Sequence, residues 1–188
     1  MIGSILHEWV LQPQYLTAWL QALAAIVALG ISAWAVLRQG AIERRRNRQE
    51  MNTLAVAIYP EIGMLKISLQ TARERITKLR ATYAGVVGQS IGATLQASAY
   101  VGMPPMIERN IDRLYILGDV AGPTCIHLAR LIIQYNVTVE MLVQRVLHLN
   151  ADQWTGAVQQ IFEHLDLLDK VVDKADHEVR PINDRVSG

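Results

Sequence analysis

The chain has 188 residues, a formal net charge of +1 and one cysteine, Cys125. A single cysteine excludes an internal disulfide and a cysteine-based zinc site, and a lone thiol is normal in a reducing cytoplasm. The charges are segregated: residues 38–80 carry ten Lys and Arg against four acids, whereas residues 150–188 carry eight acids against four bases. We therefore expect two antiparallel elements of opposite sign to pair, either within one chain or between chains.

Residues 1–14 form the first segment, which ends near Pro13. Its apolar residues recur at the spacing of one helical face, namely at Ile2, Ile5, Leu6, Trp9 and Val10. This pattern predicts a short interfacial helix on the outer leaflet of a membrane. The alternative is that the membrane helix described next begins earlier in the chain.

Residues 15–37 contain no charged side chain. As a helix they are about 34 Å long, enough to cross a hydrocarbon core of about 30 Å. No Lys or Arg precedes them, and a cluster of arginines follows, so the positive-inside rule places the N-terminus outside and the C-terminal domain in the cytoplasm. A cleaved signal peptide fits badly, because the apolar segment is too long and no basic residues precede it. The sequence therefore predicts a single-pass protein of the inner (cytoplasmic) membrane.

The span is rich in small residues, and Gln21 is its one strongly polar side chain well inside the stretch. An amide that faces acyl chains costs several kcal/mol unless it finds a partner, here another chain or water in a pore. The alternative is that Gln21 reaches the outer headgroups. Small residues at helical spacing let helices approach closely. The candidate residues of a pore or oligomer interface are Gln21, Ala25, Ala28 and Ser32.

Residues 38–50 are expected to form a basic juxtamembrane stalk. Anionic lipid of the inner leaflet attracts such a segment, by about 1 kcal/mol per cation. Charges that orient the span explain the cluster without nucleic acid, so nucleic acid is not an expected partner. The expected partners are the lipid bilayer, copies of the same chain and a cytoplasmic protein. The cluster comprises Arg38, Arg44, Arg45, Arg46 and Arg48.

Residues 51–188 are expected to form a cytoplasmic helical domain. Apolar residues step by three or four from Leu54 to Tyr83 and again from Val158 to Val179, as on one face of a helix. Pro60 is expected to kink the first of these helices or to start a new one. Residues 84–105, which hold four glycines and two prolines, are expected to form a loop.

The remaining helices are placed by their end signals. A short helix is expected over 104–117, and a longer one that Pro123 starts is expected over 123–149. Asp152 is the expected N-cap of the last helix, and Pro181 is expected to end it. No alternating strand pattern occurs. The fold class is therefore all-α, with a single transmembrane helix followed by a cytoplasmic helical bundle of about four helices.

Candidate chemical groups are few. Asp166, Asp169, Asp173 and Asp176 share one helical face and could hold a divalent cation, but no Glu-x-x-His pair accompanies them, so a solvated or salt-bridged face is the favoured interpretation. Cys125 is expected to be a buried apolar group and not a nucleophile. No nucleophile–base pair, metal motif or phosphate loop occurs. We therefore expect no enzymatic activity, no cofactor and no metal.

Two segments of the chain carry a resemblance to a known group of proteins. One is residues 104–135 (PPMIERNIDRLYILGDVAGPTCIHLARLIIQYN), and the other is the span AWLQALAAIVALGISAWAV with the Gln39 and basic run that follow it. The layout resembles small single-span bacterial membrane proteins, among them the membrane accessory proteins of some RNA-targeting CRISPR systems. The resemblance implies a ring-shaped pore with a nuclease-like helical domain. That fold uses an Arg followed after four to six residues by His. After Arg109 these positions hold Leu114, Tyr115 and Ile116, so RNA cleavage is not expected.

These patterns together predict an oligomeric membrane-anchored protein, a pore or channel that acts as an accessory or effector in bacterial antiviral defence. The alternative is a non-enzymatic membrane tether or accessory subunit of a larger complex. The two functions make different demands on the span. A pore needs its small and polar side chains to face a common axis, whereas a tether needs only apolar bulk.

Overall fold

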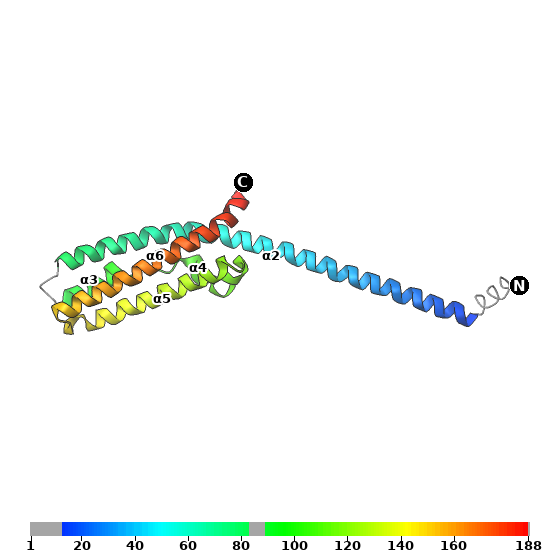
Figure 1. Cartoon of the computed structure of the whole chain (residues 1–188), viewed down its shortest axis with the longest axis horizontal. Coiled ribbons are helices and arrows are strands. Elements are labelled where there is room, and N and C mark those ends of the chain that lie inside the picture. Colours follow the sequence, from blue (N-terminus) through cyan, green and yellow to red (C-terminus); the bar gives the residue numbers. More distant parts are fainter. Residues whose placement is uncertain (1–12, 83–88, 188) are drawn as a thin grey trace. The chain divides into compact units, whose positions relative to one another are not determined.

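The computed structural model describes residues 13–82 and 89–187, and all regular secondary structure in these ranges is helical (Figure 1). The all-α class is thereby confirmed. The chain divides into two compact units, residues 1–48 and 49–188. The predicted interfacial helix falls almost entirely outside the described residues. The elements are α2 (Pro13–Thr82), α3 (Gln89–Ala99), α4 (Pro105–Arg109), the 3-10 helix η1 (Ile111–Leu117), α5 (Ala121–Arg145), the 3-10 helix η2 (Val146–His148) and α6 (Ala151–Ser187).

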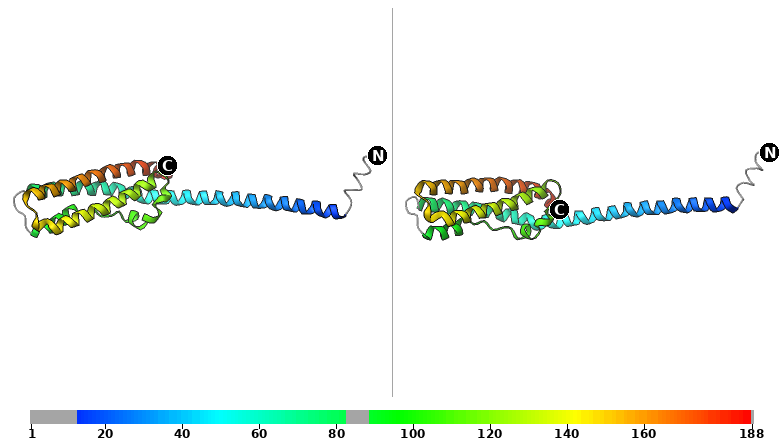
Figure 2. Two further views of the ribbon diagram at one scale, coloured as in Figure 1. Left: turned by 60° about the horizontal axis from the view of Figure 1, so that its bottom comes forward. Right: turned by 90° about the horizontal axis from the view of Figure 1, so that it is seen from below.

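The second unit is a helical bundle around one hydrophobic core. α5 packs against α6 along its length, and α3 and η1 pack against α5. The part of α2 that belongs to this unit runs beside α6 in both views of Figure 2. Each long helix contributes one apolar stripe, because residues three and four apart lie on the same face.

The two apolar seams expected from the sequence are the core faces of α2 and α6. In α6, no seam residue from Val158 to Val179 exposes more than 1% of its surface. Burying each Leu, Ile or Val side chain contributes about 1.5–3 kcal/mol, so these stripes hold the bundle together. The buried seam of α2 comprises Leu54, Ile58, Ile62, Leu65, Leu69, Ala72, Ile76 and Leu79.

The expectation of a loop over 84–105 was wrong for half of that segment, because residues 89–99 form α3. Leu95 and Ala99 of this helix are buried in the core. Gly92 faces α5 and η2, where a Cβ atom would lie only 3.3 Å from Val146. The glycine, which weakens a helix on its own, is thus what allows α3 to approach its neighbours closely. Residues 83–88 are outside the described part of the chain.

The two prolines expected to interrupt helices do not end them. α2 continues through Pro60 and no new helix begins there, and α6 continues through Pro181 to Ser187, contrary to the expectation that Pro181 ends it. Both prolines are exposed. Each helix therefore loses the one backbone hydrogen bond that the missing N–H of its proline would have made. The loss falls on the solvent side, where water can bind the freed carbonyl.

The ends of α5 differ from the prediction by a few residues. α5 begins at Ala121, two residues before Pro123, because the first N–H groups of a helix have no partner within it and proline is tolerated there. Gly118 precedes it at φ 94°, a conformation that favours glycine. A Cβ on Gly122 would lie 2.7 Å from the carbonyl oxygen of Leu114, so glycine is required for this contact with η1.

The N-terminus of α6 is capped by Asn150, not by Asp152 as expected. The backbone N–H of Gln153 donates to Oδ1 of Asn150 at 2.8 Å, and the N–H of Asn150 donates to Oε1 of Gln153 at 3.0 Å. This reciprocal pair is a capping box, which satisfies two N–H groups at once. Asp152 lies instead in the first turn, where its charge complements the helix dipole.

Candidate membrane anchor and interaction surfaces

The first unit exposes its apolar side chains. α2 is long and apolar enough to cross a membrane, and none of its most apolar stretch is buried. So much exposed apolar surface is unfavourable in water and requires lipid or another protein to cover it. This stretch is therefore a candidate membrane anchor. The exposed large residues are Trp19, Leu20, Leu23, Ile26, Val27, Leu29, Ile31, Trp34, Val36 and Leu37.

The candidate interface residues of the span lie on one face of α2. Gln21, Ala25, Ala28 and Ser32 follow at steps of four, three and four, and all four are exposed in the single chain. The Ser32 hydroxyl donates to the carbonyl oxygen of Ala28 at 2.8 Å, so the helix itself satisfies it. The Gln21 amide has no hydrogen bond within residues 13–82 and 89–187. Gln21, and not Ser32, is thus the group that requires a partner.

The basic cluster follows the apolar stretch directly. The Arg38 guanidinium lies over the ring of Trp34, 5.1 Å from its centroid. Such a pair of a cation and an amphipathic ring suits the boundary between lipid and water. The Arg44 guanidinium donates to the carbonyl of Gly40 at 3.0 Å. All five cations of the cluster (Arg38, Arg44, Arg45, Arg46 and Arg48) are exposed, as a contact with lipid headgroups requires.

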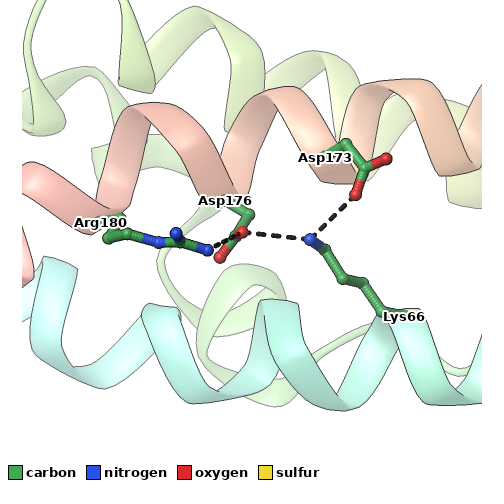
Figure 3. A network of polar contacts seen from close by, with 4 residues as sticks. All are labelled: Lys66, Asp173, Asp176 and Arg180. Atoms are coloured by element: carbon green, nitrogen blue, oxygen red, sulfur yellow. Dashed lines mark hydrogen bonds and ion pairs between the residues drawn. The ribbon is translucent and has the colours of Figure 1, made fainter.

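In the second unit, Lys66 of α2 lies between two carboxylates of α6 (Figure 3). Its Nζ is 2.9 Å from Asp173 and 3.1 Å from Asp176. Asp176 also pairs with Arg180 at 2.6 Å. The hydrogen bond that Lys66 donates to Asp173, aided by Asp176, raises the pKa of Lys66 although burial opposes it. The lysine therefore stays charged over the whole physiological range.

Arg73 of α2 makes the second ion-paired cluster, with Asp166 at 2.7 Å and Asp169 at 2.6 Å. Burial disfavours its charge, but the hydrogen bonds and charges of the two carboxylates outweigh this effect and raise the pKa of Arg73. The acidic stripe of α6 thus pairs with basic residues of the same chain. Within the described residues, no three or more His, Cys, Asp and Glu side chains are arranged to hold a metal ion.

Cys125 lies in the core with none of its surface exposed. Burial, and then the negative charge of Glu178, raises the pKa of its thiol to about 12. The thiolate is the reactive form of cysteine, and at this pKa it is scarcely populated at neutral pH. Cys125 therefore acts as a small apolar core residue, as expected from the sequence.

A groove of about 420 Å³ lies between α3, the segment after it, α4, η1 and α5. Asn136 holds one wall by bonding both the N–H and the carbonyl of Val101, and the buried Tyr135 hydroxyl donates to the carbonyl of Ala99 at 2.7 Å. The charged residues of the groove are both acidic, Glu108 and Glu140. The other lining residues are Gln96, Tyr100, Met103, Ile111, Ile133, Asn136, Val137 and Val139.

Sequence reasoning missed this groove, because its residues come from four separate elements and form no motif. The one available signal was Asn136, a polar residue within an apolar seam. Of the positions after Arg109, Leu114 is fully buried in the core and Tyr115 is exposed. The chain matches no protein-family model, no curated protein and no solved structure.

Proposed function

We propose that residues 15–37 anchor this protein in the inner (cytoplasmic) membrane and that several copies assemble there around a pore. The exposed apolar side chains around this part of α2 support the anchor, because a bilayer would remove their surface from water. The arginine cluster after the span supports an orientation with the N-terminus outside. The second unit is then the cytoplasmic helical bundle of about four helices.

The observation that carries the proposal is the contrast between two faces of one helix. Gln21, Ala25, Ala28 and Ser32 share a face without bulky side chains, while the large apolar residues occupy the rest of the surface. Small residues allow helices to approach closely in lipid. In an assembly this face turns towards a common axis, where the Gln21 amide binds water or its counterparts instead of facing acyl chains.

The test uses two variants, of which the second keeps the composition of the unaltered chain. Gln21→Leu removes the amide, and Gln21→Leu/Leu23→Gln restores it two residues later, on a different face of the helix. We expect phosphatidylethanolamine–phosphatidylglycerol vesicles that contain the full-length protein to leak potassium. Vesicles that contain either variant should leak potassium at a rate at least tenfold lower. Native-like leakage by the double variant contradicts a pore lined by this face. A clean monomer of the unaltered chain by native mass spectrometry contradicts the assembly itself.

We further propose, from the resemblance in layout, that the assembly acts as an accessory or effector in bacterial antiviral defence. In this role a cytoplasmic cue that acts on the bundle raises conduction through the span above the basal leakage expected in vesicles. We expect cells that carry the chain to depolarise during phage infection, and cells with Gln21→Leu to keep their membrane potential. Equal potentials in the two strains throughout infection contradict this role.

The groove on the bundle favours a second function, a non-enzymatic tether. An apolar groove with two acidic residues suits a basic, amphipathic segment of a cytoplasmic protein. A tether tolerates replacement of residues 15–37 by an unrelated span, whereas a pore does not. If the chain with the replaced span assembles normally and has its full effect in phage-infected cells, the tether stands and the pore is excluded. RNA cleavage by the purified chain that is lost in Arg109→Ala would overturn both non-enzymatic functions.

A further inference from the structure

From Thr53 to Ile67 the outward face of α2 carries no charge, and the exposed Glu74 and Lys78 follow on the same side of the helix. We define this outer face by six residues, Thr53, Val56, Pro60, Gly63, Met64 and Ile67, which lie opposite the buried seam. Met64 and Ile67 each expose 67% of their surface. The Thr53 hydroxyl donates to the carbonyl of Gln49 at 2.9 Å, so the one hydroxyl of this face is already satisfied. This exposed, uncharged strip is a candidate interaction surface.

Two residues of the outer face weaken the isolated helix. Pro60 has no N–H, so the carbonyl of Val56 loses its partner one turn earlier. Gly63 costs backbone entropy in a helix, and a Cβ placed on it would meet nothing within 4 Å. The bundle itself therefore gives no reason for glycine at position 63. A helix without side chains at this point does, however, permit the close approach of another helix.

The spacing of the outer face continues that of the candidate interface in the span. Alternating steps of four and three residues connect the two sets along the sequence, and only one position on the way, Arg46, is charged. A repeat of seven residues is the spacing with which helices of separate chains supercoil around each other. The positions are Gln21, Ala25, Ala28, Ser32, Ala35, Gln39, Ile42, Arg46, Gln49, Thr53, Val56, Pro60, Gly63 and Ile67.

The size of the outer face identifies its occupant. From Thr53 to Ile67 the helix is about 22 Å long, and a strip about 10 Å wide covers roughly 220 Å² per copy. Stable interfaces between soluble proteins cover about 800 Å² per partner. The strip is thus too small to hold a soluble protein by itself. It suffices for a chain that the membrane already keeps nearby, because anchoring raises the effective concentration.

We infer that the outer face packs against the outer face of a second copy of this chain, with the two helices closest at Gly63. This inference rests on the proposed assembly in the membrane and names the surface that continues it into the cytoplasm. A soluble partner protein on the same face is the competing outcome, which the test below separates.

Cysteine cross-linking with a matched control tests the contact. Gly63→Cys and Gly156→Cys each add a thiol to an exposed helical glycine with open space around it, one on the outer face and one on α6. The native Cys125 is buried and does not interfere. In membranes treated with copper–phenanthroline, two thiols lose two protons and pass one electron to each of two Cu²⁺ ions, which become Cu⁺, as the S–S bond forms. We expect most Gly63→Cys chains to become disulfide-linked dimers and Gly156→Cys chains to remain single.

A charge at the same two positions gives the second measurement. Gly63→Glu and Gly156→Glu both improve helix propensity, so neither is expected to unfold the bundle. By native mass spectrometry of the full chain in detergent, we expect Gly63→Glu to lower the association constant at least tenfold and Gly156→Glu to leave it unchanged. If the unaltered chain assembles but Gly63→Cys does not cross-link to itself, the inference is overturned while the assembly stands. A monomeric unaltered chain overturns both.

Discussion

The two units of this chain use the same apolar residue types in opposite ways. In residues 49–188, the Leu, Ile and Val residues that recur as a stripe are buried, and charged residues lie on the exposed faces, apart from the outer face of α2. In the described part of residues 1–48, the same residue types are exposed and occupy the helix surface outside the face of Gln21, Ala25, Ala28 and Ser32. A stripe can be buried against neighbouring helices, whereas a helix that is apolar all round needs an apolar solvent. Periodicity, more than composition, separates a helix that folds onto protein from one that enters lipid.

The largest expected effect comes from charges placed in the first unit. Leu23→Lys/Val27→Lys should release the full chain from membranes, because each Lys near the centre of a span costs about 2.5–3.5 kcal/mol. Extraction of membranes with alkaline carbonate, followed by immunoblotting of the supernatant, measures the release. The matched control Leu23→Ala/Val27→Ala should stay in the pellet. The membrane assignment fails if carbonate already extracts the unaltered chain.

Truncation of one leucine in the core should weaken the second unit and leave the membrane attachment of the first unit unchanged. Leu69→Ala, at a fully buried position of α2, should destabilise the bundle by about 2–5 kcal/mol without changing carbonate resistance. Leu167→Ala removes the same atoms from a position that is 43% exposed, so it should have a much smaller effect. Denaturant unfolding of the full chain in detergent compares the two. Equal losses would show that Leu69 is not part of a packed core.

A smaller loss of stability is expected when the hydrogen bond between Tyr135 and the end of α3 is removed. Tyr135→Phe leaves the carbonyl of Ala99 without its donor, and an unsatisfied buried acceptor costs about 1–3 kcal/mol. Tyr115→Phe removes the same hydroxyl from an exposed side chain and should leave the midpoint of thermal unfolding unchanged. The proposed support of the groove wall by Tyr135 is refuted if both variants melt at the native temperature.

The smallest effect near neutral pH concerns Cys125. The folded state raises its pKa from 9.0 to about 12, so above pH 9 the unfolded chain releases a proton that the folded chain retains. Stability should therefore fall as the pH rises from 9, by up to about 1.4 kcal/mol per pH unit. The raised pKa of Lys66 acts in the same direction above pH 10.5. Cys125→Ala should flatten the fall between pH 9 and 10.5, and an unchanged slope would contradict the burial of the thiol.

Local pattern explains which parts of the fold were predictable. The seams from Leu54 and from Val158 were predicted correctly, because residues three and four apart share a face whatever lies opposite. The segment QSIGATLQASA was taken for a loop, because its glycine and polar residues disfavour an isolated helix. It is helical because Leu95 and Ala99 are buried in a core that residues far along the chain complete. The prediction that α6 ends at Pro181 was wrong because the proline is exposed, so that water can replace the backbone hydrogen bond that it removes.

The sequence by itself determined the all-helical class, the charge-free stretch of residues 15–37, the core faces of the long helices and the segregation of charge. Each of these depends on residues within a turn or two of each other, so periodicity is enough to find them. Only the tertiary structure decided that Lys66 meets Asp176, 110 residues away, and that α3 and α5 enclose a groove with Glu108 and Glu140. Both sets of contacts depend on which helix faces lie next to each other after folding, and that choice is made by the packing of the whole core.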